Sequence, residues 1–208
     1  MLKCGIDIGG TNIKFGFFDG EKKVNSVVIK TPKVKGKVIP SIVCEIKKKY
    51  KPSDILGYTV AIPGVVLNDV VVFAPNTDIF GLNFKEELGL LLENDNIIVE
   101  NDANLQAMAE AKATGLDDLI LISIGTGLGG GIIIDGKLLN KNGFAGEIGH
   151  IKVHFGANSR MCGCGKLGCS EAYVSCKAIV KDYNDINHTN VNSKELFDLA
   201  RAKDKLAI

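Results

Sequence analysis

The sequence lacks several features that would place the protein in other classes. Its 25 Lys and Arg residues against 24 Asp and Glu leave a formal charge of +1, so no global electrostatic field favours nucleic acid. It has no apolar stretch near the roughly 18 residues of a membrane span, and its start, MLKCGIDIGG, lacks the long apolar core of a signal peptide. We therefore expect a cytoplasmic protein with neither a nucleic-acid nor a membrane partner.

What the sequence does have is an ordinary hydrophobic share, many glycines and a local concentration of cysteines. With 208 residues, 46% hydrophobic and 24% charged, it is long enough for one large domain or two small lobes. Many of the 24 glycines fall in runs, which indicates ligand contacts made by the backbone. Of the six cysteines, three crowd into positions 162, 164 and 169.

The hydrophobic pattern predicts an α/β fold in which a strand–glycine turn–strand unit occurs twice. This repetition predicts two lobes, residues 1–110 and 111–208, each opening with a glycine hairpin suited to phosphate. The expected strands are 2–7, 12–18, 24–30, 55–62, a pair within 65–73, 97–100, 119–124 and 132–134. The expected helices are 38–50, 83–93, 102–114, 169–183 and 194–202.

The first glycine motif, residues 7–14 (DIGGTNIK), joins two expected strands in a tight turn. Gly9 and Gly10 let backbone N–H groups approach a phosphate closely, and Thr11 adds a hydroxyl donor. Asp7, at a strand end, can hold Mg²⁺ through water. The alternative is an ordinary β-hairpin whose glycines serve only the turn.

The second glycine motif, residues 125–131 (GTGLGGG), follows a buried strand and leads into another strand. Because Rossmann and Walker loops lead into a helix, this context argues against both. A phosphate-binding β-hairpin fits better. The alternative is a glycine bulge in a twisted sheet.

A third motif, residues 100–104 (ENDAN), lies where a buried strand gives way to a helix. Such strand ends carry the ligand sites of α/β proteins. Asp102 could act there as a rigidly held general base. It could also be no more than a helix N-cap.

The cysteine segment, residues 162–169 (CGCGKLGC), is the strongest local signal. Cys162, Cys164 and Cys169 are spaced to chelate one tetrahedral zinc ion, with His150 or His154 as the fourth ligand. Four protein ligands leave no open position, so such a zinc would be structural. The alternative is three unrelated thiols.

Two glutamates and a histidine flank this cysteine segment. Glu147 and His150 precede it and Glu171 follows it, so a zinc staple would bring them together as acceptors for the vicinal hydroxyls of a sugar. For Glu171, a solvated carboxylate at a helix start is the competing interpretation.

These motifs together resemble one family. DIGGTNIK, AIPGVV, APNTD, ENDAN, IGTGLGGG, GEIGH and CGCGKLGCSEAY occur in this order, and from Leu2 nearly to the last residue the chain is similar to the ROK family of bacterial sugar kinases and repressors. The resemblance implies a two-lobed actin/hexokinase-like (ribonuclease H-like) ATPase fold with a structural zinc knot.

The resemblance also implies a role for each matched residue in ATP-dependent phosphorylation of a hexose, as in a glucokinase. Asp102 would be the catalytic base. The sugar ligands would be Gly64, Asn76, Asn101, Asp102, Glu147, His150 and Glu171. The ATP and phosphate ligands would be Asp7 (near Mg²⁺), Gly9, Gly10, Thr11, Lys14, Gly125, Thr126 and Gly127. The zinc ligands would be His150, Cys162, Cys164 and Cys169.

Two departures from the family pattern shape the expectations. Family repressors carry a winged helix-turn-helix ahead of the first glycine hairpin, and this chain starts a few residues before that hairpin, which favours a kinase over a non-catalytic sugar sensor or regulator. Family kinases continue past residue 208, so we expect a chain truncated at the C-terminus, with an incomplete second lobe and nucleotide site. Family members commonly pair, which predicts a homodimer.

Overall fold

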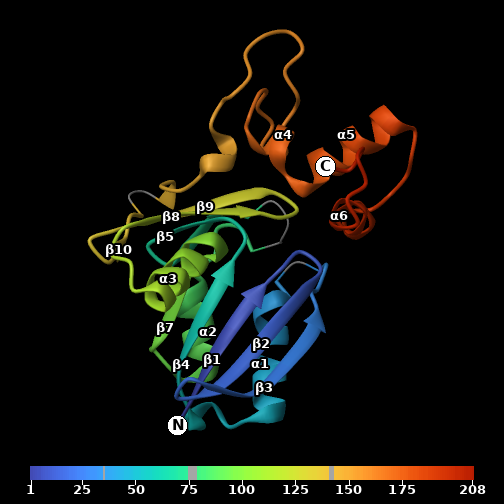
Figure 1. Cartoon of the computed structure of the whole chain (residues 1–208). Helices are drawn as coiled ribbons and strands as arrows, with labels where there is room; N and C mark the ends of the chain where they lie inside the picture. Colours follow the sequence, from blue (N-terminus) through green and yellow to red (C-terminus); the bar gives the residue numbers. More distant parts are fainter. Residues whose placement is uncertain (35, 75–78, 141–142) are drawn as a thin grey trace. The chain divides into compact units, whose positions relative to one another are not determined.

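The computed structural model describes residues 1–34, 36–74, 79–140 and 143–208, which form two units (Figure 1). The first unit comprises Met1–Ala109 and Asn140–Phe144. The second unit comprises Glu110–Leu139 and Ala145–Ile208. Helix α3 (Asp102–Thr114) therefore begins in the first unit and ends in the second.

A five-stranded sheet in the order β3-β2-β1-β4-β7 organises the first unit. Strands β1 to β3 pair antiparallel, whereas β1, β4 and β7 are parallel neighbours. Parallel strands end at the same edge of a sheet, and ligand sites of α/β proteins lie at that edge. The strands are β1 (Leu2–Ile8), β2 (Asn12–Asp19), β3 (Lys22–Lys30), β4 (Ile55–Ile62) and β7 (Ile97–Asn101); β5 (Val65–Leu67) and β6 (Val70–Phe73) form a separate hairpin.

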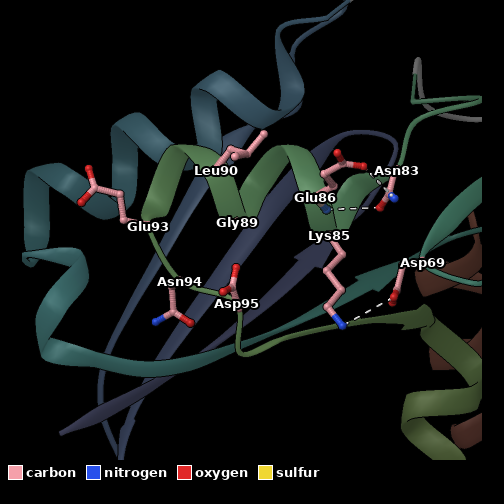
Figure 2. Close-up of a pocket in the computed structure, with 9 residues that line it drawn as sticks. All are labelled: Asp69, Asn83, Lys85, Glu86, Gly89, Leu90, Glu93, Asn94 and Asp95. Carbon is pink, nitrogen blue, oxygen red and sulfur yellow. Dashed lines mark hydrogen bonds and ion pairs between the residues drawn. The ribbon is translucent and has the colours of Figure 1, made fainter.

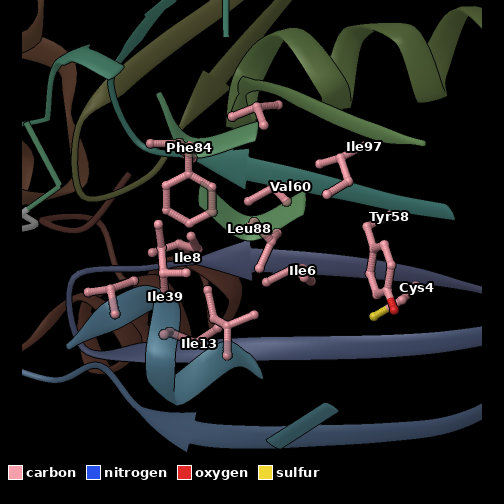
Figure 3. Close-up of a cluster of buried hydrophobic side chains, with 14 of the residues drawn as sticks. Cys4, Ile6, Ile8, Ile13, Ile39, Tyr58, Val60, Phe84, Leu88 and Ile97 are labelled. Atoms are coloured by element: carbon pink, nitrogen blue, oxygen red, sulfur yellow. The ribbon is translucent and has the colours of Figure 1, made fainter. Parts of the chain in front are cut away.

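Helices α1 (Val38–Lys49) and α2 (Phe84–Leu92) pack on this sheet, and a short 3-10 helix, η1 (Pro52–Asp54), leads into β4. Strand residues at alternate positions and helix residues three or four apart share one buried face. Figure 3 shows Ile39 of α1 and Phe84 of α2 against Ile6 and Ile13 of the sheet. These side chains are at most 3% exposed, so the first unit has a well-packed core.

The second unit contains a three-stranded sheet in the order β10-β9-β8. Its strand β8 exposes every second side chain: Ile120, Ile122 and Ile124 are 55–66% exposed. The expectation that the strand before the second glycine motif is buried is therefore wrong. The elements of this unit are β8 (Leu119–Ile124), β9 (Leu128–Ile134), β10 (Lys137–Leu138), the 3-10 helix η3 (Ile148–His150), α4 (Glu171–Val174), α5 (Cys176–Asn187) and α6 (Ser193–Arg201).

Two sequence-based predictions of elements are wrong in this unit. The helix expected over 169–183 is two helices, because Ser175 takes an extended conformation between them and its side chain accepts a hydrogen bond from the N–H of Ala178 (3.3 Å), which caps α5. The second glycine run is only partly a turn, because β9 begins at Leu128 and includes Gly129–Gly131. No described helix is long and apolar enough to span a membrane.

Candidate functional site

The first glycine hairpin is held by side chains as well as by its backbone. The N–H of Gly9 donates to the carbonyl of Asn12 (2.9 Å), and the hydroxyl of Thr31 donates to the carbonyl of Gly9 (2.6 Å). The ammonium of Lys33 donates to the carbonyl of Gly10 (2.6 Å). Sequence reasoning missed Thr31 and Lys33, because they follow β3, twenty-two or more residues away from the carbonyls that they hold.

Asp7 and Lys14 face each other across this hairpin. They are directly paired in the β1–β2 register, and the Nζ of Lys14 lies 3.1 Å from Oδ2 of Asp7. Both side chains are about half exposed or more, so the pair adds little to stability. Its effect is to place one carboxylate and one ammonium beside the turn formed by Gly9, Gly10 and Thr11.

Asn101, and not Asp102, caps helix α3. The Oδ1 of Asn101 accepts the N–H groups of Ala103 (2.9 Å) and Asn104 (3.1 Å), and its Nδ2 donates to the carbonyl of Gly64 (2.8 Å). Gly64 in turn leaves no room for a side chain, since a Cβ there would lie 2.9 Å from the Cα of Ala74. Asn101 therefore joins the end of β7 to the turn after β4.

Because Asn101 supplies the cap, the carboxylate of Asp102 is left available. Its Oδ1 accepts one hydrogen bond, from the N–H of Ala103 (2.9 Å), and the residue remains accessible to solvent. Desolvation by the surrounding protein raises the pKa of Asp102; the hydrogen bond from Ala103 lowers it less, and the negative charge of Asp7 raises it further. A raised pKa moves a carboxylate towards the range in which it accepts protons effectively.

The second glycine hairpin is anchored by the segments that follow it. The carbonyl of Gly125 accepts the N–H of Cys176 (2.9 Å), and the N–H of Leu128 donates to Oε2 of Glu171 (2.9 Å). A Cβ at Gly130 would lie 2.6 Å from the carbonyl oxygen of Gly146. Gly130 inside β9 therefore serves a close backbone approach, while Gly125, Thr126 and Gly127 form the turn.

The cysteine segment forms a compact group with His150. One donor atom each from His150, Cys162, Cys164 and Cys169 lies within 4.8 Å of all the others. Sγ of Cys164 is 3.8 Å from Sγ of Cys169, and Sγ of Cys162 is 3.7 Å from Nδ1 of His150. Zinc–sulfur bonds of about 2.3 Å at tetrahedral angles give sulfur–sulfur distances of about 3.8 Å. The donor set and its spacing fit one zinc ion.

His154 lies apart from this group. Its Nδ1 is 3.0 Å from Oγ of Ser159, and its ring stacks on Tyr173 at 5.7 Å between centroids. Of the two histidines that the spacing leaves open, the structure thus brings only His150 to the cysteines. Burial raises the pKa of Cys162 to about 12, so metal binding there would release a proton.

Glu147 and Glu171 adjoin the His150–cysteine group. Oε2 of Glu147 lies 3.7 Å from Nε2 of His150, and Oε1 of Glu171 accepts a bond from Sγ of Cys162 (3.5 Å). Since its other oxygen holds Leu128, Glu171 connects this group to the second glycine hairpin. The interpretation of Glu171 as a merely solvated carboxylate is wrong.

The predicted site residues form one group in each unit. Asn76 lies outside the described residues. In the first unit they are Asp7, Gly9, Gly10, Thr11, Lys14, Gly64, Asn101 and Asp102; in the second, Gly125, Thr126, Gly127, Glu147, His150, Cys162, Cys164, Cys169 and Glu171.

A separate pocket beside α2 contains none of them (Figure 2). It has a volume of about 450 Å³. Its polar residues serve local structure: Asn83 caps α2 by accepting the N–H of Glu86 (3.2 Å), and Lys85 lies 3.5 Å from Asp69.

Comparison with known proteins identifies the family. The model of the ROK family matches residues 3–208. The chain belongs to the ROK family. A glucokinase of Streptomyces coelicolor is 36% identical to this ROK chain over 187 residues, which cover 86% of the chain and 58% of that enzyme. The xylose repressor of Bacillus subtilis is 32% identical over 74% of the chain and 40% of the repressor.

Among solved structures, a ROK family glucokinase from Streptomyces griseus, in complex with glucose and AMPPNP, superimposes with a TM-score of 0.83. It is 32% identical, and the match covers all of this chain and 73% of that one. The predicted α/β fold class of ROK sugar kinases is confirmed. The chain spans 58% of the length of the S. coelicolor relative.

Proposed function

We propose that this ROK chain carries residues for ATP-dependent phosphorylation of a hexose. The observation that carries the proposal is the β7–α3 junction, where Asn101 takes the capping role and leaves the Asp102 carboxylate with a single hydrogen bond and a raised pKa. A base held rigidly at the carboxyl edge of parallel strands suits proton abstraction from a sugar hydroxyl.

In the proposed reaction, Asp102 accepts the proton of a sugar hydroxyl while the hydroxyl oxygen bonds to the γ-phosphorus of ATP. The bond from that phosphorus to the β,γ-bridging oxygen breaks, and ADP leaves. Phosphoryl transfer needs chiefly positioning and charge neutralisation. Lys14 can supply positive charge, and Asp7 can hold Mg²⁺, which neutralises phosphate charge when bound.

The remaining predicted residues keep their proposed roles. The sugar ligands are Gly64, Asn76, Asn101, Glu147, His150 and Glu171. The phosphate ligands are Gly9, Gly10, Thr11, Gly125, Thr126 and Gly127. His150, Cys162, Cys164 and Cys169 hold a structural zinc ion, which the fit of their donor atoms supports. A homodimer stays a prediction.

The test is ATP-dependent turnover of a hexose panel by the 208-residue chain with Mg²⁺, next to the Asp102→Asn variant. We expect turnover of at least one hexose, and a loss of about 10²- to 10⁴-fold in kcat for the variant, the range that general-base catalysis contributes. Calorimetric affinity for the hexose should stay within about threefold, since only the base is changed. Full turnover by Asp102→Asn would remove Asp102 from the base role.

A sugar-responsive regulator is the second candidate, because a xylose repressor matches 74% of the chain. It predicts hexose or pentose binding with no phosphate transfer in the same assay. If the chain shows no sugar binding and no turnover, both proposals are contradicted.

A further inference from the structure

Glu100 makes three hydrogen bonds beside the Asn101–Asp102 junction. It is the second-last residue of β7. Its Oε1 accepts the N–H of Asn101 (2.8 Å) and Nδ2 of Asn104 (3.1 Å), and its Oε2 accepts Nδ2 of Asn140 (2.8 Å). Both oxygens of the carboxylate are thus used within the first unit.

The two asparagine amides are turned towards Glu100 at a cost. An ionised carboxylate only accepts hydrogen bonds, so each amide must direct its NH₂ group at it and its oxygen elsewhere. The Oδ1 atoms of Asn104 and Asn140 are buried and have no hydrogen-bond partner among the described residues. A buried unpaired acceptor is unfavourable. Glu100 is therefore held in place at the expense of hydrogen bonds that the two asparagine oxygens would otherwise make.

What Glu100 holds in place is the residue that caps α3. Asn101 is fixed at its N–H by Glu100, at its Oδ1 by the first turn of α3, and at its Nδ2 by Gly64. Asp102 follows directly and has one hydrogen bond of its own. Any shift of Asn101 would therefore displace the carboxylate of Asp102.

We infer that Glu100, locked to Asn140, is a positioning residue for the Asn101–Asp102 junction. The inference deepens the proposed kinase function and, for its catalytic consequence, rests on it. It also gives Asn140, which belongs to the first unit, a role: through Glu100 it braces the candidate base.

A charge swap between positions 100 and 140 tests the lock. Asn140→Asp alone sets two carboxylates against each other, which is unfavourable at this separation. Adding Glu100→Gln restores the hydrogen bond between positions 100 and 140 with donor and acceptor exchanged. The oxygen of the new amide still accepts from Asn101 and Asn104, and its NH₂ group donates to the carboxylate at position 140. We expect kcat to fall about 10- to 100-fold in Asn140→Asp and to recover to within about threefold in the double variant, with the hexose KM changed less than about threefold.

Glu110→Gln is the matched control, because Glu110 is an exposed carboxylate later in α3; its kcat should equal that of the unsubstituted chain. Two results would overturn the inference: full kcat in Asn140→Asp, or a double variant no better than the single one. A loss of kcat that merely follows a lower melting temperature in both variants would also count against it.

A readout that needs no turnover separates this inference from the proposed function. Amide exchange of Asn101 and Asn104 by NMR should be faster in Asn140→Asp and restored in the double variant, since both N–H groups depend on this network. If no hexose is phosphorylated but exchange follows this order, the kinase proposal fails and the positioning by Glu100 stands. Unchanged exchange in Asn140→Asp would refute the positioning itself.

Discussion

The first unit buries 24 hydrophobic residues in one cluster, whereas the described residues of the second unit bury few. Those of the second unit are Ile133, Cys162, Cys169, Ala178 and Leu196. Two of these five are cysteines of the His150 group. A small hydrophobic core stabilises a fold poorly, and small folds compensate with cross-links or metals. The comparison indicates that the first unit depends on its core, and it predicts that the second unit depends on the proposed zinc site.

The two glycine hairpins differ in the same way, since each is anchored by the elements that stabilise its own unit. In the first hairpin, the side chains of Thr31 and Lys33 donate hydrogen bonds to carbonyls of the turn, and the strands on both sides of the turn have buried residues. Around the second, the anchors are Glu171 and Cys176, both C-terminal to the cysteine segment. The geometry of the second hairpin should therefore depend on whether that segment is ordered.

The largest expected effect comes from breaking the His150–cysteine group. Cys164→Ser removes one of four donor atoms, so we expect loss of the zinc ion and of ordered structure in the second unit, because structural zinc contributes folding free energy directly. Cys176→Ser is the matched control, since Cys176 lies outside the group. Native mass spectrometry should find one zinc per chain in the control and none in Cys164→Ser. Equal zinc in the two variants would contradict the assignment.

A matched pair of isoleucine truncations compares the two sheets. Ile13 of β2 is 0% exposed and Ile122 of β8 is 59% exposed. We expect Ile13→Ala to lower the free energy of unfolding by about 2–5 kcal/mol, and Ile122→Ala to change it by about 0.5 kcal/mol or less. Urea denaturation followed by circular dichroism measures both. Similar losses would show that β8 is covered by protein in solution.

The smallest effect is the pH dependence that follows from Asp102. Because its pKa is raised in the folded state, the stability that its proton contributes is present at low pH and is lost as pH rises through that pKa. As pH rises through that pKa, the free energy of unfolding of the unsubstituted chain should therefore fall relative to that of the Asp102→Asn variant. The acid limb of kcat/KM should have its midpoint above the usual Asp value of about 3.9. A midpoint at or below that value would contradict the raised pKa.

The sequence predicted most of the first unit because its signals are local. Alternating and helical hydrophobic spacing locate β1, β4, α1 and α2, and Asp19-Gly20 marks a hairpin turn whose glycine has a φ of 59°. The zinc-type cluster was also predictable, since three of its four members lie within eight positions.

What the sequence could not show depends on contacts between distant segments. Strand β9 extends through Gly129–Gly131 because these residues pair with β8. The close approach of Gly146 and Ile148 to Gly130 explains why a glycine stands there, and no local pattern carries that information. The bonds of Asn140 to Glu100 and of Glu171 to Leu128 span 40 and 43 positions. The capping role of Asn101, by contrast, had a local signal, because Asn and Asp are equally good N-caps and both stand at this junction.

The most direct test of the difference between the units is hydrogen–deuterium exchange by mass spectrometry on the unsubstituted chain, with and without a zinc chelator. We predict that peptides of β1, β4 and α2 keep their protection after chelation, while peptides covering 145–174 and the β8–β9 turn lose theirs. Protection that is unchanged throughout, or that is lost equally in both units, would contradict the account.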